Sequence, residues 1–180
     1  GPAPIVFTLG TSAVMAAGDF YEESIAAVQQ LGTRGIMLAG SEGVKRLSGK
    51  TSESILIIDV APHSQLFPKA AVIVQQCGIG TLGQALSAGC PILAVPFAHD
   101  QPDNAYRIEK LGVARVVYPP QYRTQRVQQE LRRLLEQAEY RRAASEVSAK
   151  VRAEDGAVAA CSAIEQYLQM YPAKLRLQPM

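Results

Sequence analysis

A glycine-bearing turn between two apolar runs is the part of this chain whose residue types and spacing could do chemistry. The apolar run 71–74 is followed by Gln75 and Gln76, and the turn 77–81 (CGIGT) then leads into a helical pattern. Glycines let a backbone approach an anion closely, and the free N–H groups and positive dipole end of a new helix then face it. The turn therefore predicts a phosphate site, with a strand-to-helix turn that needs glycine only for its geometry as the alternative.

The glycine spacing of this turn excludes two common nucleotide-binding loops. The chain contains no GxxxxGK[ST], so a Walker-type phosphate loop is absent. Gly78 and Gly80 form a GxG without the third glycine of the dinucleotide fingerprint. A dehydrogenase is also disfavoured because no such fingerprint follows the first predicted strand.

Strands and helices alternate along the whole sequence. β-rich apolar runs predict six strands, at 5–9, 35–39, 55–58, 71–74, 91–95 and 114–118. Helical spacing predicts helices at 20–31, after the glycine turn, from Thr124 and from 156 onward, whereas the polar stretch 40–54 is predicted to be mostly loop. The helix from Thr124 is expected to bury Leu135 among other leucines. The last helix, capped by Asp155, carries an apolar stripe at 158, 161, 164 and 168.

This alternation predicts a single α/β domain of the Rossmann-like type. Its parallel sheet is expected to have helices on both faces and the strand order 3-2-1-4-5-6. In that order the chain reverses direction between strands one and four, and ligands bind beyond the carboxyl ends there. Gly10, Thr11 and Ser12 should then face the segment 76–81 across one crevice. We expect the domain to span residues 1–170, with 171–180 as an irregular tail.

Composition narrows the class of protein further. Of the 180 residues, 48% are hydrophobic and the net charge is +2, so no strong field predicts nucleic acid or an anionic membrane as a partner. The three cysteines are widely spaced and suggest no metal site, and free thiols are typical of a cytoplasmic protein. No apolar run reaches the roughly 18 residues of a transmembrane helix.

The stretch from 71 to 114 resembles the C-terminal signature of nucleotide-sugar-dependent glycosyltransferases of the GT-B fold. This family includes UDP-glucuronosyltransferases, plant secondary-metabolite glucosyltransferases and bacterial antibiotic glycosyltransferases. The signature resembles HxGxGT, AL, GxP, P, DQ, NA and LG in that order, and the matching positions are Gly78, Gly80-Thr81, Ala85-Leu86, Gly89, Pro91, Pro96, Asp100-Gln101, Asn104-Ala105 and Leu111-Gly112. The resemblance continues from Ile5 to about Tyr167, and it implies the C-terminal, donor-binding half of a GT-B enzyme.

The resemblance also assigns roles in nucleotide binding. Gln76 stands where the family has a histidine that touches the donor diphosphate, and a neutral amide can donate a hydrogen bond but cannot become a cation. Cys77 occupies a family glycine position that is also cysteine in plant members. Gln84 stands where plant members have a glutamate on the ribose hydroxyls. The remaining diphosphate contacts are expected from hydroxyls and turn backbone, at Thr11, Ser12, Gly78, Gly80, Thr81 and Leu82, with a plain helix cap as the alternative for Thr81.

Two further segments resemble the base and sugar sites of the family. Backbone groups near Val60 and His63 are expected to read the nucleobase, where plant members place a tryptophan that this chain lacks. Asp100 and Gln101 resemble the pair that grips the donor sugar hydroxyls, and the alternative for Asp100 is a cap for the helix that follows. His99 is interpreted as a loop histidine near the cleft.

The implied function is one half of an inverting sugar transfer. A UDP- or dTDP-sugar would donate to a small, apolar acceptor, without a metal or other cofactor. No residue here supplies the base that takes the acceptor proton, and the family keeps that histidine in an N-terminal acceptor-binding domain. The alternatives are a natural donor-binding subunit that meets a separate partner chain, and a nucleotide-sugar binding module without turnover.

Overall fold

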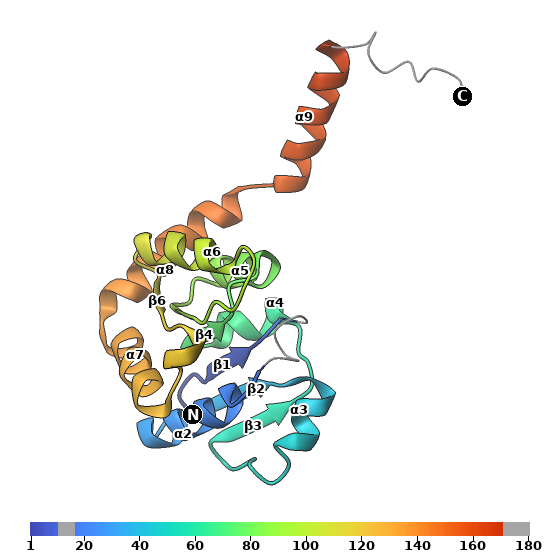
Figure 1. Cartoon of the computed structure of the whole chain (residues 1–180). Coiled ribbons are helices and arrows are strands. Elements are labelled where there is room, and N and C mark those ends of the chain that lie inside the picture. The colour runs from blue at the N-terminus through green and yellow to red at the C-terminus, as the bar shows by residue number, and fades with distance from the viewer. Residues whose placement is uncertain (11–16, 171–180) are drawn as a thin grey trace, which may run out of the picture.

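The computed structural model describes residues 1–10 and 17–170 of the chain. Strands and helices alternate through this part of the chain, as the sequence predicted (Figure 1). In chain order the elements are β1 (Ile5–Thr8), α2 (Phe20–Leu31), β2 (Gly35–Leu38), α3 (Gly40–Arg46), β3 (Ile55–Ile58), α4 (His63–Leu66), η1 (Phe67–Lys69), β4 (Val72–Gln75), α5 (Ile79–Ala88), β5 (Ile92–Ala94), α6 (Gln101–Lys110), β6 (Ala114–Val116), η2 (Pro119–Gln121), α7 (Thr124–Glu136), α8 (Ala138–Ala153) and α9 (Gly156–Met170).

The six strands form one sheet in the order β3-β2-β1-β4-β5-β6, which confirms the predicted topology. Every neighbouring pair is parallel, and Ile5 of β1 is level with Gly35 of β2 and with Val72 of β4. The strands are short and mostly apolar because a parallel sheet is buried on both faces. Strand order reverses between β1 and β4, so the ends of these two strands open the crevice that the site requires.

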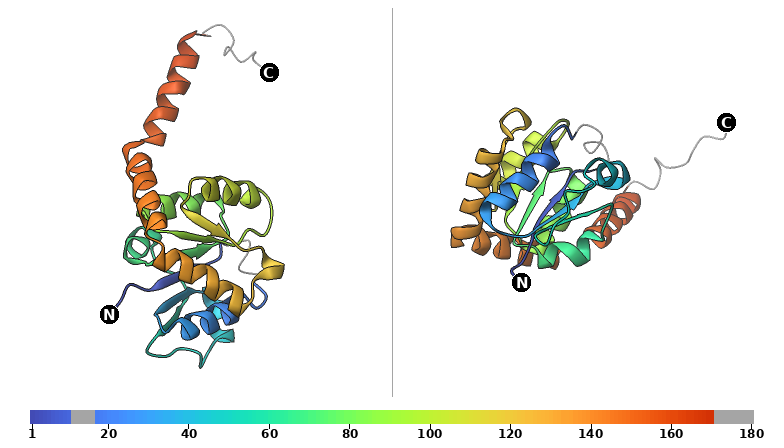
Figure 2. Two further views of the ribbon diagram at one scale, coloured as in Figure 1. Left: turned by 90° about the vertical axis from the view of Figure 1, so that its left-hand side faces the viewer. Right: turned by 90° about the horizontal axis from the view of Figure 1, so that it is seen from below.

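Helices cover both faces of the sheet, as expected (Figure 2). On one face α2 and α7 contact each other and close over a core that includes Phe7, Val74 and Leu131. On the other face α5 contacts α8, and this second core includes Ile73 and Ile92. Burial of apolar strands from both sides fixes the strand ends, and therefore the loops beyond them, in one arrangement.

The segment 40–54 was predicted to be mostly loop, and this is wrong for its first half. α3 occupies Gly40–Arg46 and leaves only the remainder irregular. Val44 packs against the core and Leu47 is fully buried three residues later, so one face of this polar segment is anchored. A Glu42–Lys45 ion pair of 2.7 Å lies on the exposed side. Two apolar residues were too few for the periodicity to stand out.

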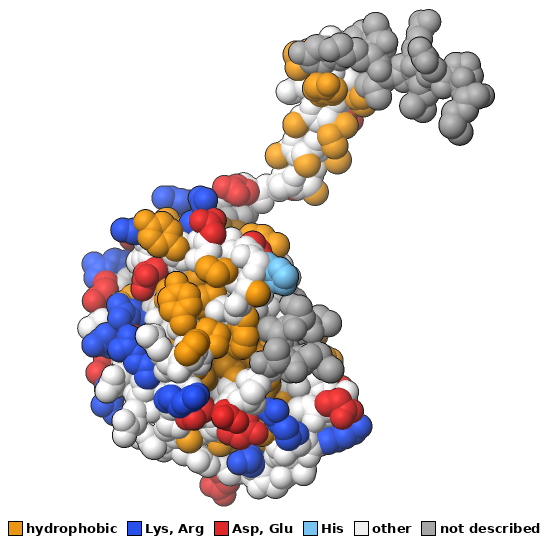
Figure 3. Space-filling view, viewed as in Figure 1, with side chains coloured by type: hydrophobic (Ala, Val, Ile, Leu, Met, Phe, Trp, Pro, Cys, Tyr) orange, Lys and Arg blue, Asp and Glu red, His pale blue; other side chains and the backbone are white. Residues whose placement is uncertain are grey.

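The C-terminal helices depart from expectation in the burial of their apolar side chains. Leu135 of α7 is 40% exposed instead of buried. The side chain of Asp155 does cap α9, accepting a hydrogen bond of 3.0 Å from the N–H of Val158. α9 buries none of its residues, however, and extends away from the body of the domain with its apolar side chains uncovered (Figures 1 and 3). Among the described helices, none is long and apolar enough to span a membrane.

Candidate functional site

The ends of β1 and β4 meet at Gly10 and Gln76. A Cβ atom added to Gly10 would lie only 2.1 Å from Nε2 of Gln76, and one added to Gly78 would lie 3.2 Å from it. The amide of Gln76 therefore fills the space between the two loops, and any side chain at position 10 would have to displace it. Of the residues predicted to face one another across a crevice, Gly10 and Thr81 line one cavity, whereas Thr11 and Ser12 lie outside the described residues.

Gln76 is buried but keeps hydrogen-bonding capacity. The residue is only 3% exposed, and within the described part of the chain its Oε1 has no hydrogen-bond partner. A buried polar atom without a partner is costly, typically about 1–3 kcal/mol, so such atoms mark places where a ligand or water completes the pairing. The amide can serve a ligand as donor or acceptor, but it brings no charge.

The glycine turn presents free backbone N–H groups, although one residue differs from the prediction. α5 begins at Ile79 with Gly78 as its N-cap, and the N–H of Leu82 donates to the carbonyl of Gly78 over 2.9 Å. The prediction that the Leu82 amide is free for phosphate is therefore wrong, and its side chain is buried. The first helical N–H groups, those of Ile79, Gly80 and Thr81, have no intrahelical partner. The N–H of Ile79 was not predicted as a phosphate contact, because a backbone donor leaves no trace in the type of its side chain.

Thr81 is the third helical residue rather than the helix cap. No side chain caps α5, and Gly78 holds the cap position, so the alternative role of Thr81 as a plain cap does not apply. Thr81 is half-buried, and its hydroxyl makes no hydrogen bond with any described residue. The hydroxyl and its own N–H are therefore both available at the same helix end, where the dipole favours an anion.

Cys77 lies in the turn with an unusual backbone conformation, and its thiol is buried. Its backbone φ of 67° lies in the left-handed region, which fits the glycine that the family pattern has there. The side chain is fully buried, and burial, together with the nearby carboxylate of Asp100, raises the pKa of the thiol to about 12. Cys77 is thus a neutral thiol that shapes the turn and contributes no charge or nucleophile.

A cavity of about 450 Å³ opens beside the turn. Its volume is within the range of small-ligand sites. It brings together residues from the ends of β1, β2 and β3 with the start of α5, namely Thr8, Leu9, Gly10, Leu38, Gly40, Asp59, Val60, Ala61, His63 and Thr81. Val60, His63 and Thr81 were predicted as site residues and lie together here. Asp59 was missed, although a lone carboxylate directly after a predicted strand was a usable signal.

The ring of His63 offers a flat surface inside this cavity. It is the first residue of α4 and stacks on the buried ring of Phe67, with ring centroids 4.4 Å apart and an angle of 12° between planes. Burial lowers the pKa of His63, so the neutral imidazole dominates at neutral pH. The neighbouring Val60 is 78% exposed, which leaves its backbone and side chain accessible to a ligand.

Asp100 and Gln101 lie where the loop after β5 leads into α6, and their side chains have different hydrogen-bond partners. Oε1 of Gln101 accepts hydrogen bonds from the N–H groups of Phe97 (2.8 Å) and Ala98 (3.2 Å), so this oxygen holds the loop. Asp100 is exposed, and Asn104 donates to its Oδ2 over 2.8 Å. Asp100 occupies the N-cap position of α6, but its side chain makes no capping hydrogen bond, so the alternative role of its carboxylate as a cap for the helix N–H groups is wrong.

The other predicted site residues are placed as follows. Gln84 is exposed on α5 and lies outside the lining of the cavity. Thr11 and Ser12 fall outside the residues that the structure describes. In the described ranges, no three His, Cys, Asp or Glu side chains gather as a metal-binding group.

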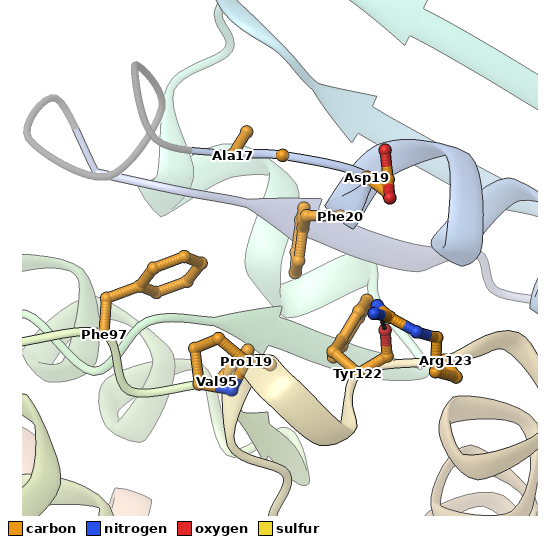
Figure 4. A pocket seen from close by; sticks show the side chains of 9 residues that line it. Ala17, Asp19, Phe20, Val95, Phe97, Pro119, Tyr122 and Arg123 are labelled. Atoms are coloured by element: carbon orange, nitrogen blue, oxygen red, sulfur yellow. Dashed lines mark hydrogen bonds between the residues drawn. The ribbon is translucent and has the colours of Figure 1, made fainter.

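A second cavity of about 240 Å³, lined by aromatic rings together with Asp19 and Arg123, lies on the same edge of the sheet. Figure 4 shows the ring of Phe97 on one side and those of Phe20 and Tyr122 on the other. Phe20 and Tyr122 stack with centroids 4.8 Å apart, and the guanidinium of Arg123 donates to the carbonyl of Tyr122 over 3.1 Å. Because Phe97 precedes the Asp100 loop, this cavity is close in sequence to the predicted sugar site.

A family model described as the erythromycin biosynthesis protein CIII-like, C-terminal domain matches residues 23–164. The chain belongs to this family. The match covers most of the sheet and all of α2 through α8 except the first residues of α2. It agrees with the fold and with the resemblance to GT-B glycosyltransferases, which is thereby confirmed.

Individual relatives place this family among sugar transferases. The sterol 3-beta-glucosyltransferase UGT80B1 of Arabidopsis thaliana is 32% identical over 136 residues, which are 75% of this chain and 22% of that protein. The glycosyltransferase of kitacinnamycin has the same fold, with a TM-score of 0.82, 23% identity, and coverage of 92% of this chain and 43% of its own. The glycosyltransferase VinC in complex with dTDP is 25% identical, with a TM-score of 0.73 and coverage of 85% and 39%. The chain thus spans about a fifth of the first curated relative and less than half of the solved structures.

Proposed function

We propose that this domain is the donor-binding half of an inverting glycosyltransferase that moves a sugar from a UDP- or dTDP-sugar to a small, apolar acceptor. The observation that carries the proposal is the cavity after β1 and β3 with unpaired N–H groups at the start of α5. A nucleobase on the His63 side and a diphosphate on the N–H groups of Ile79, Gly80 and Thr81 fit this arrangement. Membership of the family and the dTDP complex of VinC support a nucleoside diphosphate donor.

The acceptor side is incomplete in this chain. The aromatic rings of Phe20 and Phe97 in the cavity of about 240 Å³ support an apolar acceptor, and Phe97 belongs to the loop that leads to Asp100. A transfer also needs a base at the acceptor hydroxyl. Of the two histidines, His63 lines the nucleotide cavity and His99 lies exposed in a loop. We therefore propose an N-terminal acceptor-binding domain, in cis or as a separate chain, as the source of the base.

One observation favours a second candidate function. Gln76 cannot take a positive charge, so the leaving diphosphate receives less charge compensation than a histidine would give. A nucleotide-sugar binding module without turnover is therefore the second candidate. A natural subunit that meets a separate acceptor-binding chain is a variant of the first. The cytoplasm is the proposed location, since Cys77, Cys90 and Cys161 are unpaired.

Titration calorimetry and amide chemical shifts test donor binding directly. UDP or dTDP should bind and change the amide chemical shifts of Gly10, Val60, His63 and the turn 78–81. The amide chemical shifts of α8 should not change. Thr81→Val should weaken binding several-fold through loss of one hydrogen bond of about 0.5–1.5 kcal/mol. The matched control Thr51→Val alters an exposed threonine away from the cavity and should bind like wild type. Shifts clustered elsewhere, or no binding at millimolar nucleotide, would refute the site.

Turnover separates the two candidate functions. The chain alone should transfer no sugar to any acceptor, because it has neither a base nor a complete wall to hold the acceptor in line. Adding the missing N-terminal half should restore transfer if the domain belongs to an enzyme. Donor binding without transfer in the complete protein would support the binding module. Transfer at an ordinary enzymatic rate by the domain alone would contradict the proposed location of the base.

A further inference from the structure

We propose that Asn104 is a positioning residue that links the diphosphate end of the donor site to the sugar end. This inference rests on the proposed function for its ligands, but its geometry does not. The two predicted ends lie on different loops, the turn after β4 and the loop after β5. The side-chain amide of one residue on α6 reaches both.

The side chain of Asn104 divides its two amide protons between these loops. Nδ2 donates to the carbonyl of Cys77 over 3.0 Å and to Oδ2 of Asp100 over 2.8 Å. An amide nitrogen has two protons, so both are used and neither bond can be exchanged for another without loss. Asn104 is half-buried, and its own N–H donates to the carbonyl of Asp100 over 3.0 Å, which holds the backbones of the two residues one helical turn apart.

The orientation of the Cys77 carbonyl affects the start of α5. It belongs to the same peptide unit as the N–H of Gly78, the N-cap of α5. The backbone of Cys77 has a φ of 67°, a conformation that persists only when its surroundings hold it. A hydrogen bond to this carbonyl therefore orients the peptide unit that leads into the free N–H groups of Ile79, Gly80 and Thr81.

The bond to Asp100 sets the direction of the carboxylate. Asp100 is exposed, and among described residues Oδ1 has no partner, so Asn104 is what restricts its rotation. With Oδ2 tied to Asn104, Oδ1 is the oxygen left for a sugar hydroxyl. A change in one loop must consequently alter the other loop through the side-chain amide of Asn104.

Ligand-free chemical shifts test the link without any nucleotide. Asp100→Ala should shift the Gly78 amide, since Asn104 then loses one acceptor and its bond to Cys77 changes. Asp103→Ala is the matched control, because Asp103 is exposed on the same helix and pairs with Arg107 at 2.7 Å. The Asp100→Ala effect should vanish in an Asn104→Ala background. An equal effect of both aspartate variants, or one that persists without Asn104, would overturn the proposal.

Binding measurements test the role in the donor site. Asn104→Ala should weaken both the nucleoside diphosphate and its sugar nucleotide, the latter by about tenfold or more, as expected for a charge-assisted hydrogen bond. Asp100→Ala should weaken the sugar nucleotide far more than the nucleoside diphosphate, because it removes the sugar contact and disturbs the turn only through Asn104. If the nucleotides bind and Asn104→Ala leaves both affinities unchanged, the positioning role is wrong and the proposed function stands. If neither nucleotide binds but the shift coupling is found, the link stands and the proposed function is wrong.

A pH profile distinguishes positioning from a merely structural contribution and keeps the test usable if Asn104→Ala fails to fold. Asn104→Asp places a carboxylate beside Asp100, and such a pair retains one proton to a higher pH than an isolated carboxylate. The affinity deficit should therefore narrow as pH falls from 8 to about 5, because the shared proton restores a donor. Cys77, with its pKa near 12, does not titrate here, Asp103 pairs with Arg107, and α5 carries no charged side chain. His99 adjoins Asp100 and His63 lines the donor cavity, but both are also present in the wild type, so the deficit is taken relative to wild type at each pH. A pH-independent deficit would overturn the proposal.

Discussion

At the scale of single residues, glutamine at position 76 is the departure that matters most. The amide is buried between Gly10 and Gly78, where the family pattern has a histidine. An imidazole at this place could carry a proton to the departing diphosphate, whereas glutamine supplies only a neutral dipole. The arrangement can therefore keep donor affinity while slowing the departure of the nucleotide, which is the physical basis for the two candidate functions.

His63 should make the stability of the domain depend on pH. Burial lowers its pKa, so the unfolded chain binds a proton more readily than the folded one. The free energy of unfolding should therefore fall as pH drops below about 6.5, the ordinary pKa of histidine, and this stabilisation is fully present above that pH. Urea unfolding of wild type and His63→Asn between pH 5 and 8 measures the effect.

The second histidine provides the control for this measurement. His99 is exposed and has a φ of 59°, a conformation that asparagine tolerates well, so His99→Asn should keep the wild-type slope. Loss of the slope in His99→Asn, with retention in His63→Asn, would contradict the assignment of the buried imidazole.

At the scale of elements, α5 combines a structural and a binding task. Its N-terminus presents three free N–H groups, and its opposite side packs Leu82 and Ala85 into the core. Two glycines, Gly80 and Gly83, lie in this helix with no atom within 4 Å of an added Cβ. Glycine inside a helix is unfavourable. We expect Gly80 to be kept because a phosphate approaches the helix end there, a reason that does not apply to Gly83.

Alanine at these two positions should separate the tasks. Gly80→Ala and Gly83→Ala should each raise the free energy of unfolding by about 0.5–1 kcal/mol, since alanine is the better helix former. Gly80→Ala alone should weaken UDP or dTDP, because its methyl group occupies the space where a phosphate approaches the helix end. Calorimetry and urea unfolding on the pair measure both effects. Equal nucleotide affinity in the two variants would show that no phosphate binds at this helix end.

At the scale of the whole molecule, α9 is the part that the domain does not use for its own stability. Val158, Ile164 and Met170 are each at least 60% exposed, and no residue of α9 is buried. Apolar side chains on a projecting helix are typical of a surface that another domain or chain covers. The acceptor-binding domain that we propose is the candidate to cover α9.

Deleting residues 154–180 should therefore leave the domain folded. The free energy of unfolding should change by no more than about 0.5 kcal/mol, the usual range for surface changes, and nucleotide affinity should be the same. Deletion of α8 as well, from 138 onward, is the contrasting variant, because Ala144 and Ser148 are buried against the rest of the domain. A large loss of stability on removing α9 alone would mean that it packs on the domain in solution.

The sequence alone determined the fold and the location of the crevice. Alternating apolar runs and helical patterns define the strands because a parallel sheet buries both faces, and the strand order then places the loops after β1 and β4 together. Tertiary structure decided which atoms are free at that place. Sequence periodicity does not record how individual side chains and N–H groups are oriented. Only the tertiary structure therefore shows the hydrogen bond from Leu82 to Gly78, the loop contacts of Gln101, the two hydrogen bonds of Asn104 and the cavity beside Asp59. It also decided that the apolar stripe of α9 lies uncovered, since an amphipathic pattern specifies a face to be buried but not what will bury it.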